Sequence, residues 1–186
     1  GGNIRIMDSA KTSFTQCELD TFAAVYERDV DLALVGAIRA SERVRAWLRD
    51  AARFPAVDLL HIRHSWSTED DRESDIDVRF GSPPAIYVLQ IENKLDAGFQ
   101  PDQQSGYASR ADRLADETDV AVARCALLGP EAYLRVADCS AFDLVLSYEQ
   151  ARDILIHEGA WGRQAALLIQ HAILKHRRGG ADGPDD

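Results

Sequence analysis

Charged side chains interrupt two segments of this chain that otherwise alternate like β-strands. The first segment is residues 73–78 (ESDIDV) and the second is residues 90–94 (QIENK). Residues 81–84 (GSPP) lie between them and have the composition of a turn. A hairpin folded at this turn would place the acidic residues of the first segment beside the glutamate and lysine of the second. This cluster constrains the fold, because charges enclosed in a sheet need partners.

The alternation of side chains predicts which of these charges meet. Successive side chains of a strand point to opposite faces, so Asp75 and Asp77 share one face of the first strand. Glu92 and Lys94 share one face of the second strand for the same reason. Centring the turn on residues 83–84 places Asp75 opposite Glu92, and Asp77 remains the alternative.

Two carboxylates held together repel each other unless a cation lies between them. The cation that suits oxygen ligands together with water and phosphate is Mg²⁺, and this combination is typical of phosphodiester hydrolysis. Lys94, two residues after Glu92, could reach the attacking water or a phosphate oxygen. The simpler interpretation is a surface hairpin with a cross-strand ion pair, which contributes little to stability.

Composition limits the alternatives. The chain has 186 residues, which predicts one domain over residues 1–178 followed by a flexible acidic tail over residues 179–186 (GGADGPDD). Its net charge of −10 disfavours a simple high-affinity nucleic-acid binder, since such domains are usually basic. A nuclease is not excluded, because carboxylates of a metal site contribute to this charge and a bound ion inverts the local field.

The expected location is the cytoplasm. The three cysteines are widely spaced and form no C-x-x-C pair, which disfavours a disulfide framework and a zinc site. No apolar run approaches the length of a membrane span, and no secretory signal is recognisable. We therefore expect no membrane association.

The hydrophobic periodicity predicts an α/β fold: a central mixed β-sheet of four to five strands flanked by helices on both faces. Thr15-x-x-Glu18 is a predicted capping box, and Ser41 is a predicted helix N-cap. The predicted helices cover residues 13–26, 30–39, 42–53, 101–117, 130–137, 147–158 and 161–177. The predicted strands cover residues 57–65, 74–80, 85–94, 120–128 and 142–146.

The hairpin residues resemble a known family. Asp75 or Asp77, a turn and then Glu92-Asn93-Lys94 resemble the D-x(n)-E-x-K core of the PD-(D/E)xK nuclease superfamily, which has a restriction-endonuclease-like core. Residues 91–107 are similar to the E-N-K-x-x-A…Q…Q-x-x-x-Y stretch of many bacterial members. Residues 73–75 and 129–134 resemble flanking segments of one subgroup.

The resemblance implies roles for these residues. Asp75 or Asp77, Glu92 and the carbonyl of Asn93 would bind Mg²⁺, with Mn²⁺ as an alternative ion, and Lys94 would position the attacking water. Gln103 would support the site from the following helix. Many members also direct an acid from their first core helix to the metal, and here Glu18, Glu27 and Asp31 are the candidates.

Three further residues are candidate substrate contacts. Tyr107 and Arg110 follow Gln103 at helical spacing, so all three share one face of the predicted helix. His64 ends a predicted strand beside an acidic loop. The alternative for these side chains is an ordinary polar or structural role.

The sequence therefore predicts a Mg²⁺-dependent deoxyribonuclease, and family analogy places such domains in bacterial defence or DNA repair. DNA specificity would come from loops, from a homodimer or from a partner protein. One alternative is a catalytically inactive nuclease-fold module for binding or assembly. Another is an unrelated α/β domain with a surface ion-pair hairpin.

Overall fold

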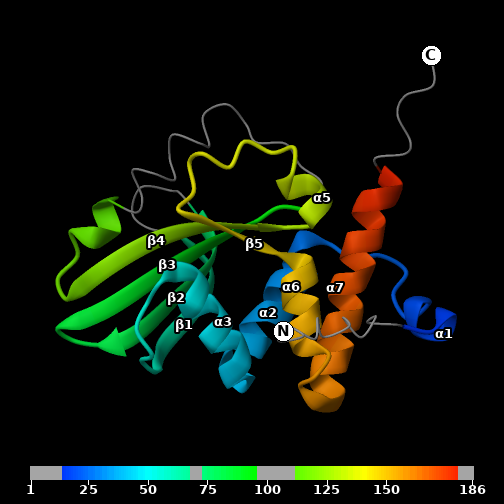
Figure 1. Cartoon of the computed structure of the whole chain (residues 1–186), viewed down its shortest axis with the longest axis horizontal. Helices are drawn as coiled ribbons and strands as arrows, with labels where there is room; N and C mark the ends of the chain where they lie inside the picture. The colour runs from blue at the N-terminus through cyan, green and yellow to red at the C-terminus, as the bar shows by residue number, and fades with distance from the viewer. Residues whose placement is uncertain (1–13, 68–72, 96–111, 180–186) are drawn as a thin grey trace, which may run out of the picture.

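The computed structural model describes residues 14–67, 73–95 and 112–179. Within these ranges, five strands form one mixed sheet in the order β1-β2-β3-β4-β5 (Figure 1). The first three strands are antiparallel, and β4 and β5 continue the sheet in parallel. The strands are β1 (Leu59–Ser67), β2 (Glu73–Ser82), β3 (Ala85–Asn93), β4 (Val120–Gly129) and β5 (Leu144–Ser147). The predicted α/β fold with a mixed sheet is confirmed.

Helices cover one face of the sheet and form the main core with it (Figure 1). Apolar side chains of β2 and β3, among them Ile76 and Ile91, pack there with Leu34 and Ile38 of α2, and all four are almost completely buried. On the other face, Leu114 packs with apolar residues of β3 and β4. The helices that lie wholly within the described residues are α1 (Gln16–Leu19), α2 (Glu27–Ala40), α3 (Glu42–Ala52), α5 (Glu131–Leu134), α6 (Tyr148–Leu155) and α7 (Gly159–Gly179).

The β2–β3 hairpin has the predicted register. Ser82 pairs with Ala85 across the turn, and Ile76 pairs with Ile91 at the far end. The next position outward places Asp75 opposite Glu92. Burial explains why the register is so well specified, since a shift of one residue would expose the apolar face of both strands.

The helix beginnings follow the predicted caps, but the first predicted helix is too long. Thr15 and Glu18 form the capping box, with the Thr15 N–H donating to Glu18 Oε2 at 2.8 Å. The helix ends at Leu19 instead of continuing to residue 26. A new helix begins at Glu27, where Asp29 Oδ2 accepts the N–H of Tyr26 at 2.8 Å.

Helix α7 is 21 residues long. Neither this helix nor any other in the described ranges is both long and apolar enough to cross a membrane.

Candidate active site

Glu92 and Lys94 lie together where β3 ends. The Nζ atom of Lys94 is 2.8 Å from Oε1 of Glu92, and both side chains are largely enclosed. Burial is the largest single effect and lowers the pKa of Lys94, but the hydrogen bond and charge of Glu92 and the charges of Glu27 and Asp75 together outweigh it, so the net pKa is raised. The lysine is therefore held as an ammonium ion at the strand end. Strand alternation predicts that Glu92 and Lys94 point to the same face, and in the structure their side chains are in contact.

Asp75 reaches the same strand end from β2. Its Oδ2 atom accepts the backbone N–H of Asn93 at 2.7 Å, across the hairpin. Burial, and then the charge of Glu92, raise the pKa of Asp75 to about 7. The two carboxylates thus interact unfavourably when both are ionised, which is the electrostatic condition expected of a site for a cation.

Asp77 lies on the same face but has different partners. Its two oxygens accept hydrogen bonds from Arg79 Nε at 3.2 Å and from Gln90 Nε2 at 3.3 Å. Arg79 also donates to Glu117 at 2.7 Å. This network occupies the carboxylate of Asp77, so Asp75 is the better candidate for a metal ligand.

The acids of α2 complete the cluster. Oε1 of Glu27 accepts the backbone N–H of Leu95 at 2.7 Å, and Oδ1 of Asp31 accepts Nδ2 of Asn93 at 2.8 Å. The two acids are four residues apart and so share one helix face. Of the three candidate helix acids, Glu18 alone lies away from the cluster, and its Oε1 accepts a hydrogen bond from Nε of Arg163 at 2.8 Å.

Asp31 is the most buried acid of α2, with 4% of its surface exposed. Burial raises its pKa to about 7, the hydrogen bond from Asn93 opposes the rise, and the charges of Glu27 and Glu92 add to it. His64 of β1 lies beside it, with Nε2 3.6 Å from Oδ2 of Asp31. The candidate substrate contact His64 is therefore at the edge of the acidic cluster.

Two tyrosines that the sequence did not single out as site residues also lie here. The hydroxyl of Tyr148, the first residue of α6, donates to Oδ1 of Asn93 at 2.6 Å. Tyr133 of α5 is near enough for the charges of Lys94, Glu27 and Glu92 to act on its pKa, which burial raises. Tyr133 follows β4, which pairs with β3, and Tyr148 follows β5, which pairs with β4. No local motif marks this long-range proximity.

Gln103, Tyr107 and Arg110 lie outside the described residues, so their predicted roles stay predictions.

The donor chemistry of the site suits Mg²⁺, but the carboxylates have other partners. In the ranges 14–67, 73–95 and 112–179, no group of three His, Cys, Asp or Glu side chains is placed to hold a metal ion. Lys94 engages Glu92, and the Asn93 amide engages Asp31. The opposed positions of Asp75 and Glu92 still offer two carboxylates from adjacent strands, which is the ligand type that Mg²⁺ prefers.

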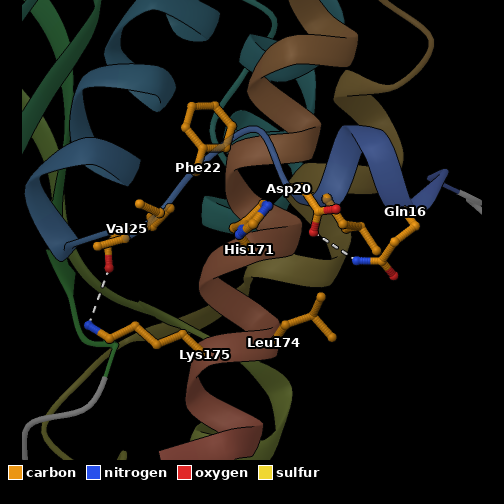
Figure 2. A pocket seen from close by; sticks show the side chains of 10 residues that line it. Gln16, Asp20, Phe22, Val25, His171, Leu174 and Lys175 are labelled. Atoms are coloured by element: carbon orange, nitrogen blue, oxygen red, sulfur yellow. Dashed lines mark hydrogen bonds between the residues drawn. The ribbon is translucent and has the colours of Figure 1, made fainter.

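A pocket of about 400 Å³ lies apart from this cluster, between α7 and the segment that follows α1 (Figure 2). His171 and Lys175 of α7 face Phe22 and Val25 across it, and Nζ of Lys175 donates to the carbonyl of Val25 at 3.2 Å. None of the acids described above, nor Lys94, lines this pocket. It is therefore a separate feature of the surface.

No protein-family model, curated protein or solved structure matches this chain.

Proposed function

We propose that this protein is a metal-dependent deoxyribonuclease that hydrolyses phosphodiester bonds at the end of the β2–β3 hairpin. The observation that carries the proposal is the convergence of Asp75, Glu92 and Lys94 at one point of the sheet, with Asp31 of α2 beside them. Two opposed carboxylates and an enclosed ammonium ion are the groups that this chemistry requires.

Asp75 and Glu92 would hold Mg²⁺ or Mn²⁺, together with the main-chain carbonyl of Asn93. The ion, when bound, supplies Lewis acidity and a water of lowered pKa. The raised pKa of Asp75 supports this assignment, because the charge of Glu92 contributes to it and a cation would relieve that repulsion.

Lys94 would act on the scissile phosphate. Its ion pair with Glu92 keeps the side chain protonated and directed to the strand end. An ammonium ion fixed beside the reacting phosphate stabilises charge that develops in the transition state, and its enclosure strengthens this interaction relative to water.

DNA is the substrate in this proposal. His64, which lies beside Asp31, would contact it. The net charge of −10 gives little general attraction to DNA, so self-association or a partner protein would supply affinity. We place the activity in the cytoplasm, in bacterial defence or DNA repair, where the thiols of Cys17, Cys125 and Cys139 would stay reduced.

A second candidate function is a binding or assembly module that keeps the nuclease fold without cutting DNA. The ion pair between Lys94 and Glu92 favours this second function, because the ammonium ion occupies the position on the carboxylate that a metal ion would take.

Cleavage assays on double-stranded and single-stranded DNA separate the two candidates. The parent and Asp75→Asn are compared with Mg²⁺ and with Mn²⁺, and Asp50→Asn is the control, since Asp50 is an exposed acid of α3. The nuclease proposal expects cleavage by the parent and by Asp50→Asn but none by Asp75→Asn. DNA binding without cleavage by the parent would favour the assembly module.

A further inference from the structure

Asn93, the last residue of β3, lies between Glu92 and Lys94 and is held by three elements. Its side chain is completely buried, and Oδ1 accepts the hydroxyl of Tyr148 at 2.6 Å. Nδ2 donates to Oδ1 of Asp31 at 2.8 Å and to the carbonyl of Glu27 at 3.0 Å. The backbone N–H donates to Asp75 at 2.7 Å. Residue 93 thus connects α2, β2 and α6 at the candidate active site.

The partners of Asn93 admit one orientation of its amide. The carboxylate of Asp31 and the carbonyl of Glu27 are both acceptors, so they require the NH₂ group. A flipped amide would place its oxygen against both of them and leave buried donors and acceptors unmatched. The hydroxyl of Tyr148 can donate to the amide oxygen, and it thereby favours the orientation that serves Asp31.

The orientation of Asn93 matters because its backbone joins Glu92 to Lys94. The side chain of Asn93 points to the opposite face of the strand from these two groups, so it acts from behind the reacting face. Tyr148 is fully buried in the main core, where a phenylalanine ring would supply nearly the same apolar contact. Its hydroxyl contributes the specific bond to Asn93.

We infer that Tyr148 is a positioning residue of the active site, which acts by orienting the Asn93 amide that holds Asp31 and the end of β3. The catalytic part of this inference rests on the proposed nuclease function. The orienting contact itself does not, because it is a property of the folded protein alone.

The test compares Tyr148→Phe with the parent and with Tyr87→Phe. Tyr87 lies on the same strand as Asn93, but its ring packs on Phe54 with centroids 5.4 Å apart. The first readout is the NMR signal and the solvent exchange of the Asn93 side-chain NH₂ group without metal. We expect faster exchange and a shifted signal in Tyr148→Phe only.

The second readout is cleavage kinetics. Loss of one orienting hydrogen bond should lower kcat by about tenfold while KM for DNA changes by less than about twofold, because the reacting groups are misplaced but the substrate contacts remain. Tyr87→Phe should match the parent in both constants. A purely structural hydroxyl would lower the melting temperature and leave kcat unchanged.

The inference is wrong if the Asn93 NH₂ signal is the same in Tyr148→Phe and in the parent. It is also wrong if the Asn93 NH₂ group exchanges faster in Tyr148→Phe while kcat is unchanged. If the parent cleaves no DNA with either metal, the proposed function fails, and the NMR comparison still decides whether Tyr148 orients Asn93.

Discussion

The ammonium group of Lys94, the residue directly after β3, lies 2.8 Å from the carboxylate of Glu92 near the end of that strand. Only 12% of the lysine side chain and 9% of the glutamate side chain are exposed. An enclosed ion pair recovers little more than its desolvation cost, so it is weak evidence for a role in stability alone. Its position beside Asp75 and Asp31 favours a role in chemistry instead.

Replacing Lys94 by alanine should abolish cleavage while DNA binding changes little. The ammonium ion acts on the transition state more than on the bound substrate, and removing one such stabilising group costs on the order of 10²–10³ in kcat. Single-turnover cleavage and a DNA-binding titration measure the two effects separately. Lys175→Ala on α7 is the matched control and should cut like the parent. If Lys94→Ala cleaves DNA as fast as the parent, the lysine has no part in the mechanism.

Mg²⁺ or Mn²⁺ at millimolar concentration should raise the melting temperature of the parent. A ligand that binds only the folded state stabilises it by mass action, and the unfolded chain does not assemble the site. Glu92→Gln removes one ligand charge at nearly constant volume, so the rise should be lost in that variant. General screening of the −10 charge would persist in Glu92→Gln and would be reproduced by NaCl at matched ionic strength. Equal shifts in parent and variant would argue against a specific metal site.

Asp75→Asn should stabilise the metal-free protein increasingly as the pH rises. The pKa of Asp75 is about 7 in the folded protein, above its ordinary value of 3.8. The folded state therefore binds more protons than the unfolded state between these values, so the free energy of unfolding falls as the pH rises from about 4 to about 7. The asparagine variant lacks this titration but keeps an acceptor for the Asn93 N–H. Thermal melts from about pH 5 to about pH 8 measure the difference, which should grow and then level off above pH 7. A difference that is constant with pH would contradict the assignment.

Gly129→Ala should destabilise the protein and impair cleavage. A Cβ atom at Gly129 would lie 2.8 Å from the carbonyl oxygen of Lys94 and 3.2 Å from Cδ1 of Tyr133. The strand end would have to shift, at an expected cost of about 1–3 kcal/mol in the free energy of unfolding. Gly36→Ala is the control, because a Cβ atom there would meet no heavy atom within 4 Å outside the adjoining backbone of its own helix. Since Gly36 is inside α2, that control should gain about 0.5–1 kcal/mol. Urea denaturation of both variants checks the pair, and a neutral Gly129→Ala would show that this contact does not constrain Lys94.

The hairpin and its register could be predicted from sequence because their signals are local. Alternation fixed the shared face of Glu92 and Lys94, and the turn at residues 83–84 fixed the pairing of Asp75 with Glu92. The end of the first helix could not be predicted in the same way. Its capping box is a local signal, whereas its end at Leu19 depends on how the following residues enter α2.

The residues that reach the site from other elements were harder to predict. The choice among Glu18, Glu27 and Asp31 could not be made from the sequence. The packing of α2 against the sheet brings Glu27 and Asp31 to the end of β3. Tyr148 follows a helix cap that predicts where α6 begins but not what its ring contacts. These choices depend on long-range packing, which no short motif contains.

Nicking and linearisation of supercoiled plasmid DNA in Mg²⁺ decide whether the protein is a metal-dependent nuclease. The parent, Glu92→Gln and Lys94→Ala are measured side by side, with EDTA added to a matched sample of the parent. We expect cleavage by the parent, none in EDTA and none by either variant. Absence of cleavage by the parent with both Mg²⁺ and Mn²⁺, or equal cleavage by all three proteins, would contradict it.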